Sequence, residues 1–335
     1  MGHPITDVRD ISRIAYGFMA SKALFCALSL DLFLRLSAQP HSVASLAAAL
    51  GVAANRLEPL LSTLDELGLV AREDGAYRNA PASEQYLVSG AAADFSDYYR
   101  FQIDRLIYPR LSNLRDCFGA EERLDNFYAG PMEDALTAEE FIRGQHAGSK
   151  GPAYLLAKTV DLGKRRHLLD VGGGSGAVSH ALCKRFPQLR ATILEIPSVI
   201  PLAERYTREA GLQGRIAFVA GDALGTAWPA PVDAVLLSYL LSSIAGDAVP
   251  GVLAKAAAAL EPGGVLIVHD FIHAERDNSP SLTPLWALTA MALNPETAML
   301  TEARMRSLLA EPGFADITQQ PLVSGITAVI TCRKP

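Results

Sequence analysis

The sequence has few cysteines and no excess of positive charge. Its four cysteines among 335 residues lie far apart and form no Cys-x-x-Cys pair. Neither a disulfide framework nor a zinc site is indicated, and we expect no metal centre. The 30 Lys and Arg residues are outnumbered by 36 Asp and Glu residues, which gives a formal net charge of −6. This balance argues against a nucleic-acid partner, because such proteins usually present a basic face.

Long apolar runs and targeting signals are also lacking. No run approaches the roughly 18 apolar residues of a membrane-spanning helix, and the N-terminus has no signal-peptide core. Half of the residues are hydrophobic and a fifth are charged, an ordinary globular composition. We therefore expect a cytoplasmic protein with no membrane partner and with a length that suits two domains.

Residues 1–100 predict a helical domain that contains a winged helix. The segment 11–37 is apolar with sparse charges, as expected of a helix that is buried on several sides, and we interpret it as a dimer-forming helix. Ser42 and Asn55 predict the N-caps of two helices, and a hairpin turn is predicted at Asp74-Gly75. Acidic residues outnumber basic ones here, so we expect dimerisation rather than DNA binding.

Residues 101–335 predict an α/β domain. Residues 101–162 are mostly helical in pattern, with a capping-box signature at Thr137-Ala-Glu-Glu140, and we expect them to connect the domains and cover a pocket. Later segments alternate between strand and helix, which predicts a mostly parallel sheet. Residues 315–319 and 327–332 predict a closing antiparallel pair.

A glycine-rich turn between a strand and a helix marks the candidate ligand site. It follows the apolar strand-like run at residues 168–171 and precedes a helical pattern at 177–186. Glycines without Cβ atoms let the backbone approach a ligand, and the helix N-terminus directs its amide groups at the same point. The spacing of Gly172, Gly174 and Ala177 also fits a loose dinucleotide fingerprint, so spacing alone does not exclude NAD.

Three acidic residues at strand ends narrow the choice of ligand. Asp170 would repel a pyrophosphate, but it could orient the turn or meet a cationic ligand. Glu195 ends the next strand, at the separation expected of a ribose-binding acid. Asp222 follows the third strand, where it could accept a hydrogen bond from an adenine amino group. A ligand with ribose and adenine but no phosphate suits this set, and S-adenosylmethionine is such a ligand.

These segments resemble the class I S-adenosylmethionine-dependent methyltransferases, and more closely the small-molecule O-methyltransferases of plants and bacteria. The resemblance is carried by Asp170-Val-Gly-Gly-Gly-Ser-Gly176, Glu195-Ile196, Gly221-Asp222 and the stretch from Thr301-Glu302 to Pro312-Gly313-Phe314. It covers nearly the whole chain. It implies a Rossmann-like sheet, an N-terminal winged-helix domain that forms homodimers, a small-molecule substrate and S-adenosylmethionine as the cofactor.

The resemblance also implies cofactor contacts. Gly172 and Gly174 would pass the methionine part, Glu195 would bind the ribose hydroxyls, and Ile196 would lie against the adenine. The segment from Phe141 to Ser149 resembles a helix that covers the cofactor. The full implied cofactor-binding set is Asp170, Gly172, Gly174, Glu195, Ile196, Asp222, Ala223, Ser238 and Ser149.

The chain departs from the family at the catalytic positions. A strand-end motif that usually finishes in His-Asp-Trp finishes here in Ser242-Ser243-Ile244. A serine hydroxyl does not accept a proton near neutral pH as an imidazole does. Asp270 falls at the position of a family acid, with His269 and His273 beside it. The candidate catalytic residues are Asp270, His269, Tyr239, Ser242 and Gln145, the last in place of a frequent methionine.

Three hypotheses follow from this departure. The first, which we favour, is methyl transfer to oxygen, nitrogen or carbon of a small molecule of secondary metabolism. Asp270, His269 or His273 would supply any base, and proximity would supply most of the rate. The second is a non-methylating enzyme in which the cofactor cyclises to azetidine-2-carboxylate and releases methylthioadenosine. The third is a winged-helix regulator that binds S-adenosylmethionine without catalysis.

Overall fold

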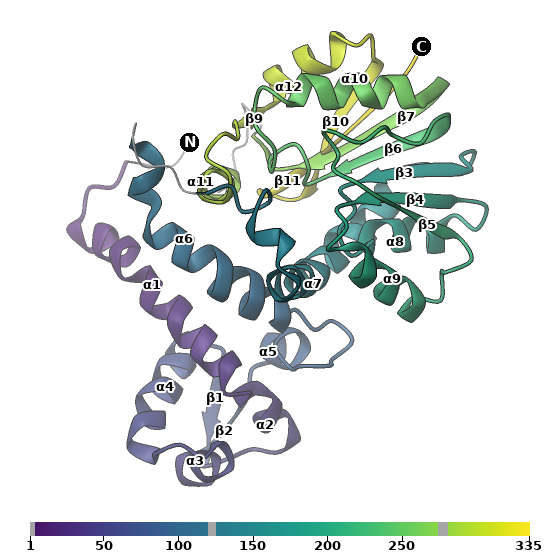
Figure 1. Cartoon of the computed structure of the whole chain (residues 1–335). Coiled ribbons are helices and arrows are strands. Elements are labelled where there is room, and N and C mark those ends of the chain that lie inside the picture. Colours follow the sequence, from purple (N-terminus) through teal and green to yellow (C-terminus); the bar gives the residue numbers. More distant parts are fainter. Residues whose placement is uncertain (1–3, 120–124, 274–280) are drawn as a thin grey trace. The chain divides into compact units, whose positions relative to one another are not determined.

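The computed structural model describes residues 4–119, 125–273 and 281–335. The chain divides into two units, residues 2–106 and residues 107–335, and each is described by itself. Figure 1 labels their helices and strands.

The first unit is a set of helices around one β-hairpin. Its elements are α1 (Val8–Ser29), α2 (Leu32–Ala38), α3 (Val43–Leu50), α4 (Ala54–Glu66), β1 (Val70–Glu73), β2 (Ala76–Asn79), α5 (Pro81–Tyr86) and a π-helix that begins at Tyr98 and ends at Ile107. The core is formed by fully buried leucines such as Leu28, Leu46 and Leu61. These side chains come from three different helices, so their burial holds the helices together.

The sequence predicted some of the helix caps and turns of this unit correctly, but not all of them. Ser42 caps α3 by accepting the backbone N–H of Ser45. The hairpin turn at Asp74-Gly75 is also confirmed, because both residues have positive φ values and β1 pairs with β2 in antiparallel fashion. The prediction that Asn55 caps the next helix is wrong. Helix α4 already begins at Ala54, and its N-cap position is Ala53.

The apolar segment at the N-terminus differs from its prediction in one way. It is two helices, because Asp31 adopts a left-handed conformation between α1 and α2. Several apolar side chains of α1, including Ile14 and Phe18, are exposed on the single chain. By length and composition α1 could also cross a membrane, since its most apolar 18-residue window has a mean hydropathy of 1.2. The prediction that no segment approaches such a span is therefore wrong on these two criteria.

The second unit is an α/β layer structure. Its helices are α6 (Tyr108–Ser112), α7 (Ala135–Thr159), α8 (Ala177–Arg185), α9 (Ile200–Glu209), α10 (Val249–Ala259), α11 (Thr283–Leu293) and α12 (Glu302–Ala310), with 3-10 turns at Leu114–Phe118 and Pro131–Glu133. Its main strands are β3 (His167–Val171), β4 (Arg190–Glu195), β5 (Ile216–Ala220), β6 (Val232–Ser238), β7 (Leu260–Asp270), β10 (Ala315–Val323) and β11 (Thr327–Arg333). The two short strands β8 (Ile272–His273) and β9 (Leu300–Thr301) pair with each other.

The large sheet has the strand order β10-β11-β7-β6-β3-β4-β5. The five strands from β7 to β5 run parallel, whereas β11 runs antiparallel to β7 and β10. This confirms the expected mostly parallel sheet with an antiparallel C-terminal pair. Strand order reverses between β3 and β6, and ligands of such sheets bind outside the carboxyl ends of the strands at this switch point.

Helices cover both faces of the sheet (Figure 1). On β3, Leu168 packs into one buried cluster with residues of α7 and α8, while Leu169 packs into another with residues of α10 and α12. This alternation follows from the two-residue period of a strand. Both faces are therefore buried, as is usual for parallel sheets.

Helix α7 is a single long helix. It is continuous from Ala135 to Thr159 and contains Pro152. Its N-cap is Asp134, which accepts the N–H of Thr137 at 2.8 Å, so the predicted capping box at Thr137 is wrong. Proline removes one helical hydrogen bond. Burial of neighbouring Ala147, Ala153 and Leu156 offsets that loss.

Candidate functional site

The glycine turn is a tight loop between β3 and α8. Gly172, Gly174 and Gly176 have φ values of +67°, +55° and +80°, a region that other residues rarely occupy. A Cβ atom on Gly174 would lie 2.3 Å from Oε1 of Gln145 on α7. The turn therefore needs glycine for its backbone conformation and for the close approach of α7.

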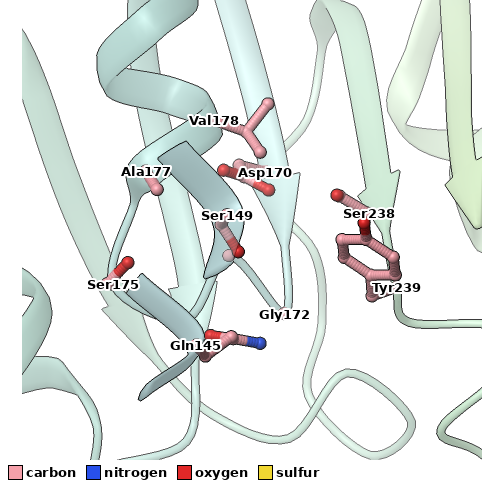
Figure 2. Close-up of a pocket in the computed structure, with 10 residues that line it drawn as sticks. Gln145, Ser149, Asp170, Gly172, Ser175, Ala177, Val178, Ser238 and Tyr239 are labelled. Atoms are coloured by element: carbon pink, nitrogen blue, oxygen red, sulfur yellow. The ribbon is translucent and has the colours of Figure 1, made fainter. Parts of the chain in front are cut away.

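A small pocket, partly open to solvent and referred to below as the cavity, lies against this turn. Figure 2 shows side chains from α7, from the turn and from the end of β6 around it. Six of the residues that the sequence singled out line the cavity: Gln145, Ser149, Asp170, Gly172, Ser238 and Tyr239. The wall also contains Gly173, Ser175, Ala177 and Val178. None of these was a candidate site residue, although Ala177 had been noted as part of the glycine spacing.

Asp170 is the buried acid of the cavity wall. Its Oδ2 atom accepts a hydrogen bond from the Ser179 hydroxyl at 2.6 Å, while Oδ1 is buried with no partner among the described residues. Burial raises the pKa of Asp170 to about 7, against the opposing effect of the Ser179 hydrogen bond. An unpaired buried carboxylate oxygen is costly, so this atom fits a ligand that brings a cation or a hydrogen-bond donor.

Glu195 joins the end of β4 to the glycine turn. Its Oε2 atom accepts the N–H of Gly174 and its Oε1 atom accepts the N–H of Ile196, both at 2.8 Å. Burial raises the pKa of this carboxyl group. Each carboxylate oxygen has a further lone pair, so Glu195 can hold the turn and still accept hydrogen bonds from ribose hydroxyls.

Asp222 stabilises the loop that follows β5. Its carboxylate accepts the backbone N–H groups of Leu224 and Gly225 at 3.2 and 3.1 Å. The Lys255 ammonium binds carbonyl groups of the same loop, including that of Ala223. The loop begins beside Glu195, because Gly221 donates its N–H to the Glu195 carbonyl. The three acids therefore follow one another along the sheet edge in the expected order.

His269 is enclosed in the protein. It is fully buried, its Nδ1 lies 3.0 Å from the Ser238 hydroxyl, and its Nε2 lies 3.1 Å from the Thr327 hydroxyl. Burial lowers its pKa to about 3. Both ring nitrogens are therefore engaged, and the imidazole is neutral near neutral pH.

Asp270 and Ser242 bind each other. Asp270 is fully buried, and its Oδ2 accepts the backbone N–H of Ser242 at 3.1 Å. Burial raises its pKa to about 6, opposed by hydrogen bonds from the Ser242 hydroxyl and from the backbone N–H groups of Phe271, Ser242 and Leu241. The Ser242 carbonyl in turn accepts the Thr297 hydroxyl at 2.9 Å. These contacts hold the loop after β6 in place, and the Asp270 carboxylate accepts several hydrogen bonds from the protein itself.

Tyr239 begins an aromatic group beside the cavity. It has a φ of +57°, an unusual conformation for a bulky residue and one that clusters at functional sites. Its ring packs 4.4 Å from His269 and 5.0 Å from Phe271 between centroids. Phe271 stacks on Trp286 of α11 at 4.8 Å. Burial raises the pKa of the Tyr239 phenol, so this hydroxyl stays protonated.

Two further residues were not recognised in the sequence. His146 of α7 contacts Ser175 in the glycine turn; its position next to Gln145 was the available signal. Tyr128 lies in an irregular segment, and its pKa is raised by burial and by the charge of Asp270. No local pattern marks Tyr128, because the Asp270 carboxylate that acts on it lies more than a hundred positions away.

Comparison with known proteins gives consistent results for both units. The family description "O-methyltransferase domain" matches residues 114–315, and "O-methyltransferase dimerisation domain" matches residues 12–89. The tetracenomycin polyketide synthesis 8-O-methyl transferase TcmO of Streptomyces glaucescens is 26% identical over 99% of each chain. The L-tyrosine C(3)-methyltransferase of Streptomyces lavendulae is 28% identical over 94% of this chain and 88% of that relative.

A solved structure shows the same similarity in three dimensions. The crystal structure of human N-acetylserotonin methyltransferase in complex with S-adenosylmethionine has a TM-score of 0.86 and 25% sequence identity. The alignment covers 100% of this chain and 99% of the human chain. The similarity therefore extends over both units.

Proposed function

The chain belongs to the O-methyltransferase family, and from this premise we propose that it methylates a small acceptor that brings its own nucleophile. As a member of this family it is an S-adenosylmethionine-dependent methyltransferase. The relatives do not support the cyclase or regulator hypotheses. When bound, S-adenosylmethionine supplies a methyl group on a positively charged sulfur, so the methyl carbon is electrophilic without further activation.

The cofactor fits the residues that surround the glycine turn. We propose that the unpaired oxygen of Asp170 accepts a hydrogen bond from the amino-acid end, where Gln145 and Ser149 form the opposite wall. Glu195 binds the ribose hydroxyls, and Asp222 accepts from the adenine amino group, with Ile196 and Ala223 beside the ring. The orphaned oxygen in a wall built from left-handed glycines supports this arrangement.

The single observation behind the proposed chemistry is that Ser242 is hydrogen-bonded to Asp270. Ser242, which the sequence resemblance assigns to the position of the family's histidine, uses its backbone N–H and hydroxyl to bind Asp270. His269 is fully buried with both nitrogens engaged. Neither residue is therefore poised to remove a proton from an acceptor. We propose that the acceptor binds already ionised, or reacts through a carbon or an amine, and that alignment supplies most of the rate.

The aromatic group beside the cavity favours a planar aromatic acceptor. The stacked rings of Phe271 and Trp286 and the edge of Tyr239 offer flat apolar surfaces, which aromatic ligands contact well. The printed names of the two Streptomyces relatives specify transfer to oxygen and to carbon. We therefore propose a phenol or an electron-rich aromatic carbon as the methylated atom.

We propose that the N-terminal unit forms the dimer contact of a homodimer. Its match to the dimerisation domain and the exposed apolar side chains of α1 support this proposal. We further propose a winged helix within a domain that ends near residue 100, followed by a catalytic domain over residues 101–335. The four unpaired cysteines suit a cytoplasmic location. Sedimentation of the purified protein and cell fractionation test the assembly and the location.

A series of phenols with graded acidity tests the proposed chemistry. If the acceptor must arrive ionised, the pH midpoint of kcat/KM follows the pKa of each phenol. A midpoint that stays constant across the series would show that a group on the enzyme removes the proton and would contradict the proposal. Incubation with S-adenosylmethionine alone is the control, and release of methylthioadenosine in that sample would contradict methyl transfer as the main reaction.

A further inference from the structure

His146 connects three elements that surround the cofactor cavity. It lies on α7 between Gln145 and Ser149, which both line the cavity. Its Nδ1 atom lies 2.9 Å from the hydroxyl of Ser175 in the glycine turn. Its ring stacks on Tyr206 of α9, with 3.9 Å between centroids and 14° between ring planes. One side chain therefore joins the covering helix to the turn after β3 and to the helix after β4.

The segment of α7 around His146 must be held in position, because it forms part of the cavity wall. Gln145 reaches so close to Gly174 that a Cβ atom there would collide with it, so a small shift of α7 changes the cavity wall. The nearby ion pair between Glu139 and Arg205 has side chains that are 46% and 40% exposed, and exposed pairs contribute little. The contacts of His146 are better sheltered.

The imidazole is suited to a permanent contact. Burial, with smaller effects of Lys150 and His180, lowers the pKa of His146 to about 4. The ring is therefore neutral at neutral pH, and it can stack on Tyr206 without placing a second positive charge next to a cationic cofactor.

We propose that His146 is a positioning residue for S-adenosylmethionine, which holds the Gln145–Ser149 stretch of α7 against the glycine turn through Ser175 and Tyr206. The wall that faces the amino-acid end of the cofactor is then formed before the cofactor binds. A preformed wall raises affinity because no ordering of α7 is needed on binding. His146 itself does not line the cavity among the residues described there.

Calorimetry with S-adenosylhomocysteine tests this role without catalysis. We expect His146→Ala to weaken binding about tenfold, through loss of one hydrogen bond and one aromatic contact. His146→Asn keeps a polar atom near the Nδ1 position but loses the stack, so we expect it to recover part of the affinity. Steady-state kinetics is expected to show a raised KM for S-adenosylmethionine, with the KM for the acceptor and kcat nearly unchanged.

Two matched variants separate positioning from general destabilisation. Tyr154→Ala removes a 58% exposed ring from the same helix and is expected to leave binding unchanged. Ser175→Ala removes the other partner of the hydrogen bond. Because Ser175 also lines the cavity, the double variant with His146→Ala is expected to lose less affinity than the sum of the two single losses. Additive losses in this double-mutant cycle would show independent roles and would overturn the proposal.

An unchanged affinity of His146→Ala for S-adenosylhomocysteine, with cooperative thermal unfolding retained, would also overturn it. A loss of kcat without a change in affinity would do the same. If His146→Ala fails to fold, the milder variants His146→Asn and Ser175→Ala decide the question. Unchanged binding in both would again contradict a positioning role.

Discussion

The proposed cofactor side and the proposed acceptor side of this sheet edge differ in how they use their polar residues. On the cofactor side, Asp170 keeps an unpaired oxygen at the cavity, and Glu195 keeps acceptor capacity beside the glycine turn. On the acceptor side, Ser242, His269 and Asp270 direct their polar atoms at the protein itself. The cofactor side presents carboxylate oxygens to a ligand. The acceptor side uses its polar side chains to stabilise its own loop.

The difference has a physical origin. The cofactor cradle depends on backbone conformation, because several glycines in the left-handed region must occur together, and a side chain at any of them strains the turn. The acid–base chemistry of the acceptor side depends on single side chains. A serine at position 242 leaves the backbone N–H to Asp270 in place. Cofactor binding and reaction chemistry can therefore change separately within one fold.

Gly174→Ala is expected to have the largest effect, because it adds a side chain at a position of the cofactor side where the backbone is left-handed. The methyl group would stand in the space between the turn and α7, 2.3 Å from Gln145 Oε1. The added atom would displace the end of the Gln145 side chain, which lines the cavity. We expect S-adenosylhomocysteine to bind on the order of a hundredfold more weakly, as measured by calorimetry.

Gly211→Ala is the matched control for this variant. Gly211 also has a positive φ, of +71°, but no atom lies within 4 Å of the position of a Cβ there. It imposes the same backbone strain without the close approach, so we expect lower stability and unchanged affinity. Equal affinity losses in the two variants would show that strain, and not the cavity, decides binding.

Ser242→His tests whether a general base is the only group that the acceptor side lacks for removing a proton from the acceptor. The imidazole is expected to raise kcat/KM for a weakly acidic phenol by at least about tenfold, since general base catalysis contributes roughly 10²–10⁴-fold when well placed. The pH profile should gain a midpoint near that of histidine. Ser243→His places the same group one residue away and is expected to give no gain. Identical pH profiles for wild type and Ser242→His would argue that more than the base has changed.

The ionisation of Asp170 predicts how cofactor affinity depends on pH. Its pKa of about 7 is above that of an unfolded aspartate, so its ionisation destabilises the free protein as pH rises from about 4 to 7. The same ionisation creates a carboxylate that can bind the ammonium group at the amino-acid end of the ligand. We expect the affinity for S-adenosylhomocysteine to rise several-fold between about pH 6 and pH 8.

Methylthioadenosine and Asp170→Asn are the controls for this pH dependence. Methylthioadenosine has no amino-acid end, so its affinity should stay constant over the same range. Asp170→Asn should remove the dependence for S-adenosylhomocysteine. A slope that persists in Asp170→Asn would assign the titration to another group, and would weaken the contrast between the two sides.

The sequence predicted those features that depend on local backbone or on strand order. The glycine turn, the sheet and the order of Asp170, Glu195 and Asp222 belong to this class, because spacing along the chain determines them. The continuity of α7 through Pro152 was not predictable, since it depends on burial against α8. Tyr128 was missed because Asp270, which acts on it, lies far away in the sequence, whereas His146 could have been found from its position next to Gln145. The break between α1 and α2 was missed because an apolar pattern does not show the left-handed conformation of Asp31.

His269 gives the last and smallest expected effect on chemistry. As a fully buried neutral imidazole with a pKa of about 3, it favours the unfolded state as pH falls from about 6.5 towards 3, because the unfolded chain binds the extra proton. His269→Asn should lose about 2 kcal/mol of stability near pH 7.5 through lost packing and hydrogen bonds. The loss should be smaller near pH 5, where the wild-type histidine already weakens the fold. Urea unfolding at the two pH values measures this difference, while the pH midpoint of kcat/KM should not move. A shift of that midpoint would make His269 part of the proton transfer, and the acceptor side would then resemble the cofactor side in presenting a working group to its ligand.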